Sequence, residues 1–174
     1  VIPAFNESKT IKKIVSETIH FGIPIVVDDG SSDQTAEIAI KNGAKIVIHD
    51  NNYGYDAALN SGFLKAKEMG CDCIITFDAD GQHNPNLLKL FIGAIENGAD
   101  VVLGVRDKTQ RFAEKLFAII AHKKFGIIDP LCGMKAYRTD VYNELGHFDS
   151  YNSIGTELAI FAVKKDKRIK QIHF

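Results

Sequence analysis

The chain has 174 residues, of which 45% are hydrophobic and 25% charged, a balance typical of a soluble globular domain with a sizeable core. Its formal net charge of −1 argues against a non-specific nucleic-acid binder. No apolar run reaches the ~20 residues of a membrane-spanning helix, no signal peptide precedes the first strand pattern, and the three cysteines lack metal-like spacing. These features predict a cytoplasmic protein with ordinary packing thiols.

Strand and helix patterns alternate along most of the chain. Strands are predicted at residues 1–2, 25–27, 45–49, 73–77, 101–105, 134–137 and 169–174. Helices are predicted at residues 8–20, 33–40, 57–69, 85–97 and 111–125, with two more in the less regular part after residue 126. This order indicates an α/β fold with a mostly parallel sheet and helices on both faces. We expect one domain over residues 1–174 that continues past both ends, since each end falls within a strand pattern.

Polar side chains follow four of the predicted strands, always at the carboxyl end. The segments are Pro3-Ala4-Phe5-Asn6-Glu7, Asp28-Asp29-Gly30-Ser31-Ser32-Asp33, Asp78-Ala79-Asp80-Gly81-Gln82 and Gly104-Val105-Arg106. Taken singly, each has an ordinary structural explanation, such as capping a helix or lying on the surface. Together they lie at the edge where open parallel sheets bind ligands, which favours a binding site.

The paired acids Asp78 and Asp80 indicate the chemistry of this site. Two carboxylates one residue apart, followed by glycine, suit Mg²⁺ or Mn²⁺ that also coordinates phosphate oxygens. Such a metal acts as a Lewis acid for a departing diphosphate. Asp28 or Asp29 is a candidate to accept hydrogen bonds from a base or ribose, and Arg106 to pair with a phosphate.

These segments, in this order, resemble glycosyltransferase family 2. The matching segments are Val1 to Glu7, Val27 to Thr35, Asn52-Tyr53-Gly54 with Ala58 and Gly62, and Asp78 to Gln82, within residues 1–106. Asp80-Gly81-Gln82 and the later Asp129-Pro130-x-Cys132-Gly133-x-Lys135 are most similar to the branch of dolichol-phosphate mannose synthases and bacterial polyprenyl-phosphate glycosyltransferases.

The resemblance implies a GT-A fold and metal-dependent, inverting transfer of a sugar from a nucleotide-diphosphate sugar. The implied acceptor is a polyprenyl phosphate, with a sugar hydroxyl of a growing glycan as the alternative. By position, the implied donor-binding residues are Pro3, Ala4, Phe5, Glu7, Asp28 or Asp29, Gly54, Asp78, Ala79, Asp80 and Gln82. Arg106, Arg111 and Lys135 are implied on the side of the acceptor or the diphosphate. Tyr55-Asp56 departs from the family pattern, in which a basic residue often follows the glycine.

Two later features bear on the acceptor. Glu157 is a candidate general base if the acceptor is a hydroxyl, and otherwise a first-turn glutamate favoured by the helix dipole. A lipid phosphate is already ionised and needs no base. The helix predicted at residues 111–125 mixes apolar and basic side chains, which fits a core helix or a helix at the inner membrane surface.

Three other protein classes fit parts of the pattern. A response-regulator receiver also has paired acids and binds Mg²⁺, but it places the pair on its first strand. A sugar nucleotidyltransferase carries a glycine-rich loop with basic residues after its first strand, which residues 3–10 lack. A non-catalytic nucleotide-sugar binding module is the remaining alternative, because of Tyr55-Asp56.

Overall fold

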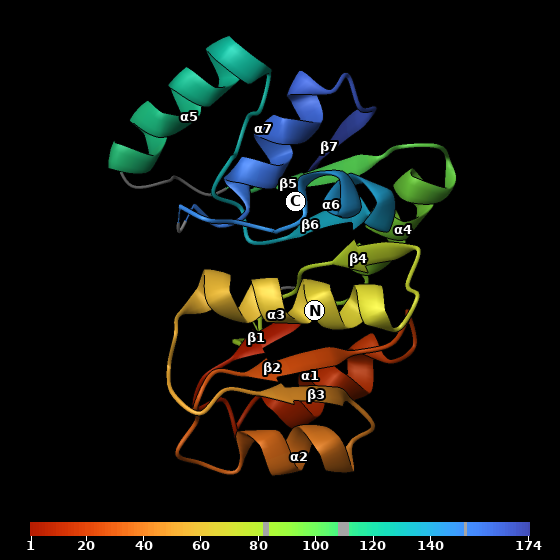
Figure 1. Ribbon diagram of the computed structural model, residues 1–174, viewed down its shortest axis with the longest axis vertical. Helices are drawn as coiled ribbons and strands as arrows, with labels where there is room; N and C mark the ends of the chain where they lie inside the picture. The colour runs from red at the N-terminus through yellow and green to blue at the C-terminus, as the bar shows by residue number, and fades with distance from the viewer. Residues whose placement is uncertain (82–83, 108–111, 152) are drawn as a thin grey trace.

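The computed structural model describes residues 1–81, 84–107, 112–151 and 153–174, and for residues 112–116 it describes the backbone alone. The described strands are β1 (Ile2–Ala4), β2 (Ile25–Asp28), β3 (Lys45–Ile48), β4 (Cys73–Ile75), β5 (Val101–Val105), β6 (Lys135–Arg138) and β7 (Ile169–His173). The described helices are α1 (Ile11–Thr18), α2 (Thr35–Lys41), α3 (Tyr55–Glu68), α4 (Leu87–Glu96), α5 (Phe112–Phe125), α6 (Thr139–Leu145) and α7 (Thr156–Lys164). Figure 1 shows the strands between helices, the three layers of an α/β fold.

The strands form two hydrogen-bonded groups that meet at Val1. β1, β2 and β3 are parallel neighbours, while β4, β6, β5 and β7 follow in that order. The backbone nitrogen of Val1 donates to the Ile75 carbonyl at 2.7 Å, and the Phe77 nitrogen donates to the Val1 carbonyl at 3.0 Å. These two bonds place β1 directly beside β4, so that one sheet crosses the molecule.

The prediction of a mostly parallel sheet is confirmed, with one exception. β6 lies between β4 and β5 and runs antiparallel to both. β7 then pairs with β5 in parallel. The direction of a strand is not encoded in its apolar pattern, so the sequence identified the strand near residues 134–137 without its orientation.

The helices pack on both faces, as predicted. One apolar cluster joins the sheet to α1, α2 and α4 through residues such as Ile14, Ala39 and Phe91. The other joins it to α3, α6 and α7 through residues such as Phe63 and Leu158. α3 lies unusually close to the sheet, because a Cβ at Gly62 would come within 2.2 Å of the Val1 side chain. A glycine is therefore required at that contact.

The helix boundaries differ slightly from those predicted. α1 begins at Ile11 rather than residue 8, because residues 8–10 form a turn in which the Thr10 and Ile11 nitrogens donate to the Glu7 carbonyl. α3 begins two residues earlier than predicted, at Tyr55. Asp33 does not cap α2 as its N-cap residue, although its carboxylate accepts from the Thr35 nitrogen at 3.0 Å.

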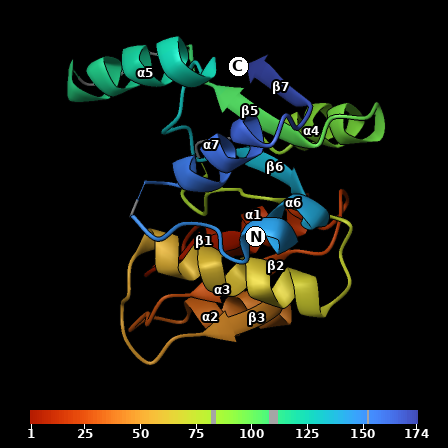
Figure 2. The same cartoon turned by 45° about the horizontal axis from the view of Figure 1, so that its top comes forward.

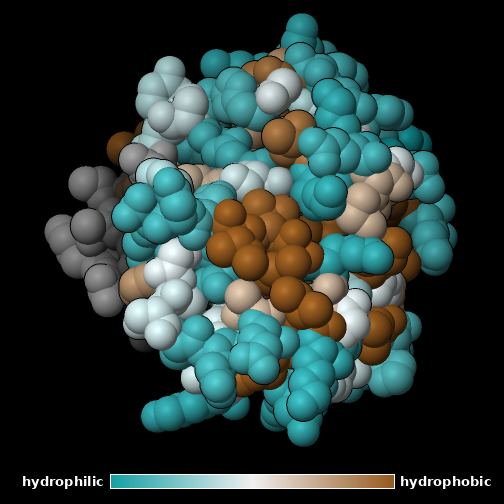
Figure 3. Space-filling view, turned by 60° about the horizontal axis from the view of Figure 1, so that its bottom comes forward, coloured by the Kyte–Doolittle hydropathy of each residue, from teal (hydrophilic) through white to brown (hydrophobic). Residues whose placement is uncertain are grey.

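Two parts of the surface carry exposed apolar side chains. α5 lies at the periphery in both ribbon views and exposes Phe117, Ile119 and Ile120, while Ala121 is buried (Figures 1 and 2). Apolar side chains also gather near the centre of the face seen from the side of α2 and β3 (Figure 3). Among the described residues, no helix has the length and apolar character that crossing a membrane requires.

Candidate active site

A cleft of about 470 Å³ opens at the carboxyl ends of β1, β2, β4 and β5. Its lining comes from segments far apart in the chain: Pro3, Ala4, Phe5, Glu7, Asp29, Asn52, Gly54, Tyr55, Ala58, Asp78, Ala79, Asp80, Arg106, Leu131, Gly133 and Ile154. The strand-end residues predicted from the sequence therefore lie together, with the exceptions described below.

The loops after β1 and β2 are tied together by hydrogen bonds. The Asn6 nitrogen donates to Ser31 Oγ at 2.8 Å, and the Glu7 nitrogen donates to Thr35 Oγ1 at 2.8 Å. Asn6 has φ of 57°, a conformation that asparagine tolerates better than most residues. These bonds fix one wall of the cleft, on which Phe5 is exposed.

Asp29 organises the next wall. Its buried carboxylate accepts from the backbone nitrogens of Tyr53 at 3.0 Å and Gly54 at 2.7 Å, and it contacts His49 Nδ1 at 2.7 Å. Asp28 is also buried, but its Oδ1 accepts from the Ser31 nitrogen, and it is not among the residues that line the cleft. Of the two aspartates predicted to contact a base or ribose, Asp29 is the one at the cleft.

Asp78 and Asp80 lie on the floor of the cleft, with Asp78 half-buried and Asp80 exposed. The Tyr55 hydroxyl donates to Asp78 Oδ1 at 2.7 Å. Burial raises the pKa of Tyr55, and the neighbouring charge of Asp78 acts in the same direction. The Tyr55 hydroxyl therefore keeps its proton near neutral pH and donates its hydrogen bond to Asp78 throughout that range.

Gly133 lies against the carboxylate of Asp78 and close to the Tyr55 hydroxyl. A Cβ at this position would lie 2.8 Å from Asp78 Oδ2 and 3.0 Å from the Tyr55 hydroxyl. Only glycine leaves room for Asp78 in its present position. In the sequence Tyr55 is only a departure from the family pattern, whereas in the structure it is a neighbour of the paired acids.

The carboxylates of Asp78 and Asp80 suit Mg²⁺ or Mn²⁺, provided that a bound ligand completes the coordination shell of the metal. No group of three or more His, Cys, Asp or Glu side chains in the described part of the chain is arranged to hold a metal ion. Two carboxylates suffice when phosphate oxygens and water supply the remaining ligands, which is the usual arrangement for Mg²⁺ at nucleotides. Asp78 and Asp80 fit this requirement.

Arg106 lines the cleft but is paired with Asp129. Its Nε donates to Asp129 Oδ2 at 2.8 Å, and its Nη2 donates to Oδ1 at 2.9 Å. The Asp129 side chain is 1% exposed, whereas that of Arg106 is 34% exposed. A bidentate pair of this kind fixes the plane of the Arg106 guanidinium at the wall of the cleft.

Lys135 is fully buried, which differs from its predicted place at the acceptor. Its Nζ donates to the carbonyl of Pro130 at 2.8 Å and also to that of Ile154. Burial lowers the pKa of Lys135 to about 8, although nearby negative groups, including Asp149, act against this shift. Lys135 thus holds together the two loops that carry Leu131 and Ile154, rather than lining the cleft.

This burial predicts a pH dependence of stability. The pKa of Lys135 is 10.5 when unperturbed and about 8 when folded, so the unfolded chain holds more protons between pH 8 and 10.5. The contribution of Lys135 to the free energy of unfolding therefore rises with pH across this window, by up to about 3 kcal/mol. Urea denaturation of the wild type and Lys135→Met at several pH values measures this difference, with Lys170→Met as the control for charge loss. A constant difference between pH 8 and 10.5 would contradict the assignment.

Glu157 is held away from the cleft lining. Its Oε2 accepts from the Ser150 nitrogen at 2.6 Å and from Ser150 Oγ at 2.7 Å, and its Oε1 contacts His147 Nε2 at 3.0 Å. Burial tends to raise the pKa of Glu157, but the hydrogen bonds from Ser150 and His147 outweigh it and lower the pKa. This placement gives no support to the predicted general base. Gln82 and Arg111, also predicted at the site, lie outside the described residues.

Fold and site together define a nucleotide-diphospho-sugar transferase fold of the GT-A type. The solved structure of glucosyl-3-phosphoglycerate synthase from Mycobacterium tuberculosis, in complex with Mn²⁺, UDP and glucosyl-3-phosphoglycerate, superposes with a TM-score of 0.80 at 22% identity, covering 99% of this chain and 67% of that one. The model of the family "Glycosyl transferase family 2" matches residues 1–146. The chain belongs to glycosyltransferase family 2.

Three curated relatives refine this placement. An uncharacterized protein of Methanocaldococcus jannaschii is 30% identical over 189 residues, covering 99% of this chain and 78% of the relative. UDP-N-acetylglucosamine–dolichyl-phosphate N-acetylglucosaminyltransferase of Methanococcus voltae is 34% identical over 131 residues, covering 64% and 52%. Undecaprenyl-phosphate 4-deoxy-4-formamido-L-arabinose transferase of Edwardsiella ictaluri is 32% identical over 168 residues, covering 84% and 50%. The chain thus spans about half the length of these two named enzymes, whose names place them in the polyprenyl-phosphate branch predicted from the sequence.

Proposed function

We propose that this domain transfers a sugar, with inversion, from a nucleotide-diphosphate sugar to a polyprenyl phosphate, using Mg²⁺ or Mn²⁺ held by Asp78 and Asp80. The observation that carries the proposal is the position of both carboxylates on the floor of a cleft that also contains Pro3, Phe5 and Asp29. When bound there, the metal would supply Lewis-acid stabilisation of the departing diphosphate. Family membership and the two named relatives support the same reaction class.

In this proposal, different residues of the chain bind the nucleotide, contact the phosphates and orient the metal ligands. Asp29 and the loops after β1 and β2 form the wall for the nucleotide, since their hydrogen bonds keep that wall in one conformation. Arg106, whose guanidinium is held by Asp129, lines the cleft beside the paired acids and would contact phosphate oxygens there. Tyr55 keeps Asp78 oriented through its hydroxyl.

Each carboxylate described at the cleft already has another role, which favours an acceptor that needs no general base. Among the side chains that the structure describes, four acidic ones line the cleft, namely Glu7, Asp29, Asp78 and Asp80. Glu7 accepts from Thr10 Oγ1 at 2.7 Å, Asp29 holds the backbone of residues 53–54, and the other two are assigned to the metal. Since a phosphate oxygen needs no general base, a lipid phosphate suits this cleft better than a sugar hydroxyl.

A polyprenyl acceptor also requires access to a membrane surface. α5 exposes Phe117, Ile119 and Ile120 and ends with His122, Lys123 and Lys124. Exposed apolar and basic side chains on one helix are typical of peripheral contact with anionic lipid. We therefore place the enzyme at the cytoplasmic face of the membrane.

Ligand binding and product analysis test the proposal. Thermal shift with UDP, GDP and their sugar conjugates is expected to give stabilisation that requires Mn²⁺ or Mg²⁺ and disappears with EDTA. Transfer of labelled sugar to undecaprenyl or dolichyl phosphate, followed by extraction into organic solvent, identifies the acceptor, and NMR of the product gives its anomeric configuration. No response to any nucleotide with metal present would refute the proposal, while binding without transfer would favour a non-catalytic binding module.

Replacing Tyr55 with phenylalanine is predicted to weaken metal binding by roughly tenfold, since groups that orient metal ligands are commonly worth that much. The change removes only the hydroxyl that donates to Asp78. Calorimetric titration of Mn²⁺ in the presence of UDP or GDP measures the change in Mn²⁺ affinity. Tyr53→Phe is the matched control, because that hydroxyl donates to Asp50 on the surface. Equal Mn²⁺ affinity of the two variants would show that Tyr55 does not orient Asp78.

A further inference from the structure

His49 joins the wall of the cleft to α3 through two short contacts. Its Nδ1 lies 2.7 Å from Asp29 Oδ1, and its Nε2 lies 2.8 Å from Ser61 Oγ. The side chains of His49 and Asp29 are nearly buried, with 11% and 5% exposed. Hydrogen bonds from backbone N–H groups favour the ionised form of a carboxylate, so the proton between Asp29 and His49 belongs to Nδ1. In the neutral ring, Nε2 then accepts from the Ser61 hydroxyl.

The order Asp29, His49, Ser61 is that of a hydrolase triad, but its placement is not that of a catalytic group. A nucleophile has to reach its substrate. Ser61 lies in the middle of α3, and neither Ser61 nor His49 is among the described residues that line the cleft. Asp29 is the member of the chain that does line it. His49 and Ser61 therefore act on the cleft through Asp29.

The hydrogen bonds of Asp29 leave its carboxylate one acceptor position. An ionised carboxylate has about four such positions, two on each oxygen. Oδ1 accepts from His49 Nδ1 and from the Tyr53 nitrogen, and Oδ2 accepts from the Gly54 nitrogen. Among the described residues these three groups are the donors to Asp29, so one position on Oδ2 is left for a ligand. His49 is the donor that fills the second position on Oδ1.

A single acceptor position discriminates between nucleotide bases. Uracil and thymine present one ring N–H between two carbonyl groups, which a single carboxylate oxygen can accept. Guanine presents a ring N–H beside an amino group, and a carboxylate pairs with this edge through both of its oxygens. Adenine and cytosine place a ring lone pair at the same edge, which a carboxylate repels. Stacking on the exposed ring of Phe5 would add affinity for any of these bases, because every base has a π-face.

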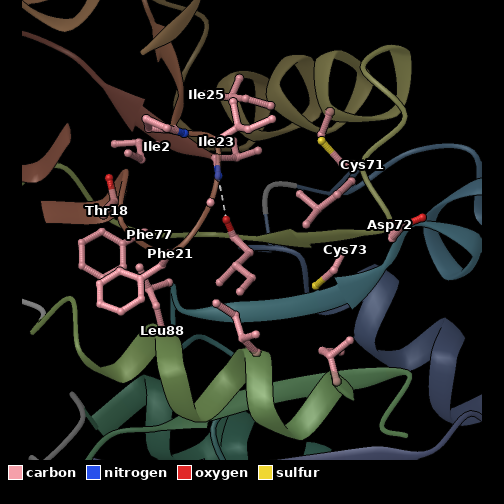
Figure 4. A pocket seen from close by; sticks show the side chains of 18 of the residues that line it. Ile2, Thr18, Phe21, Ile23, Ile25, Cys71, Asp72, Cys73, Phe77 and Leu88 are labelled. Carbon is pink, nitrogen blue, oxygen red and sulfur yellow. Dashed lines mark hydrogen bonds between the residues drawn. The ribbon is translucent and has the colours of Figure 1, made fainter. Parts of the chain in front are cut away.

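The pocket at the amino end of β1 does not suit a nucleotide, although it is slightly larger than the cleft. Its volume is about 510 Å³, and apolar side chains such as Ile23, Phe77 and Leu88 make up most of its lining (Figure 4). Phosphates bind to cations, metal ions and backbone N–H groups rather than to such walls. Discrimination between nucleotides is therefore sought at the cleft, where Asp29 lies.

We propose that His49, anchored by Ser61, positions Asp29 to accept one hydrogen bond from the ring N–H of uracil or thymine. The sugar donor is then a uridine or thymidine diphosphate sugar rather than a guanosine one. His49 is a positioning residue, because it acts through Asp29 and occupies the place on Oδ1 that guanine would need. This inference rests on the function proposed for the cleft, since it names the nucleotide of the same site.

Nucleotide binding by the unaltered chain tests the choice of base. Calorimetric titrations with Mn²⁺ present compare UDP, dTDP, GDP and UDP methylated at N3. UDP is expected to bind at least about tenfold more tightly than GDP, because Asp29 cannot bond both N–H groups of guanine. The N3-methyl analogue is expected to bind at least about 30-fold more weakly than UDP, because it lacks the ring N–H. The affinities of UDP and dTDP distinguish the two bases that share this edge.

Two replacements of His49 test its role as a positioning residue. The amide nitrogen of asparagine can take the place of Nδ1, whereas that of glutamine takes the place of Nε2. His49→Gln is therefore expected to weaken UDP roughly tenfold and to narrow the preference for UDP over GDP at least threefold, because the Asp29 carboxylate is free to turn. His49→Asn is expected to restore both values to within about threefold of the wild type. His20→Gln, at an exposed position of the surface, is the control.

The outcomes separate this inference from the function proposed for the cleft. Equal affinity for UDP and GDP, or for UDP and its N3-methyl analogue, would overturn the assignment of Asp29 to a ring N–H while leaving a metal-dependent nucleotide site. Parallel loss of UDP and GDP in His49→Gln, without recovery in His49→Asn, would reduce His49 to a structural role. No binding of any of the four nucleotides with Mn²⁺ would overturn the proposed function and this inference together.

Discussion

Replacing Asp80 with alanine is expected to remove nearly all of the metal-dependent stabilisation by nucleotide. Changes in residues that only support metal ligands cost about 10–100-fold in affinity, so loss of a direct carboxylate ligand is expected to cost at least about 100-fold. At a nucleotide concentration 100 times its Kd, ligand binding stabilises the wild type by about 2.7 kcal/mol. After a 100-fold loss of affinity, the same concentration leaves only about 0.4 kcal/mol.

The measurement is thermal shift with UDP or GDP at a fixed Mn²⁺ concentration, followed by calorimetric titration. Asp140→Ala is a suitable control, because Asp140 is an exposed aspartate of α6 that does not line the cleft. Since Asp80 is exposed, its replacement is expected to leave the fold without ligand almost as stable as the wild type. An unchanged Mn²⁺-dependent shift in Asp80→Ala would remove Asp80 from the metal site.

The second large effect concerns the fold around the cleft. Arg106→Ala is expected to lower the free energy of unfolding by about 3 kcal/mol, because it leaves the carboxylate of Asp129 buried without its guanidinium partner. For a chain of this size, the melting temperature should fall by roughly 6–12 °C. The partial exposure of Arg106 places the cost at the lower end of the range for buried pairs.

The chain contains a matched control for this effect. Arg168 makes the same two-bond contact with Asp100, with distances of 3.1 and 3.0 Å, but its side chain is 68% exposed. Arg168→Ala should therefore cost less than about 1 kcal/mol. Chemical denaturation of both variants makes the comparison, and Arg106→Lys separates charge from the paired geometry. Similar losses in Arg106→Ala and Arg168→Ala would mean that burial of Asp129 contributes little.

The part of the site that could be predicted from the sequence follows from one rule. Polar residues at the carboxyl ends of parallel strands meet at one edge, so Glu7, Asp29, Asp78 and Arg106 were expected together and do lie together. The rule requires only that the strands be recognised and that their neighbours run parallel. The apolar runs of this chain make both inferences possible.

The remaining cleft residues depend on contacts that no local pattern encodes. Leu131 and Gly133 reach the cleft because β6 runs antiparallel between β4 and β5, and its direction was not predictable. The resemblance to the family implied Lys135 on the acceptor side, yet two backbone carbonyls satisfy its charge inside the protein. Charge predicts exposure only when the fold offers no buried partners.

Tyr55 is the clearest case of a missed signal. Its contact with Asp78 joins residues 23 positions apart and depends on how α3 packs on the sheet, which it meets closely at Gly62. The sequence did show that Tyr55 departs from the family pattern, and it lies at the first turn of a helix that points at the strand ends. A residue that departs from the family pattern at such a position can make a new contact as well as lose one.

The antiparallel insertion of β6 also has a consequence for the order of folding. β4 and β5 are consecutive in the chain, but the edge of β4 away from β1, and the edge of β5 that faces it, find their partner only when residues 135–138 arrive. During synthesis from the amino end, one edge of β4 and both edges of β5 therefore stay unpaired while the chain lengthens from β5 to β6. Pairings between distant segments are slow, so closure of this gap is expected to limit the folding rate. The cleft wall formed by the loops after β1 and β2 is expected to form early and the side that carries Leu131 and Gly133 last, which leaves the incomplete sheet most exposed to chaperones and to aggregation during that interval.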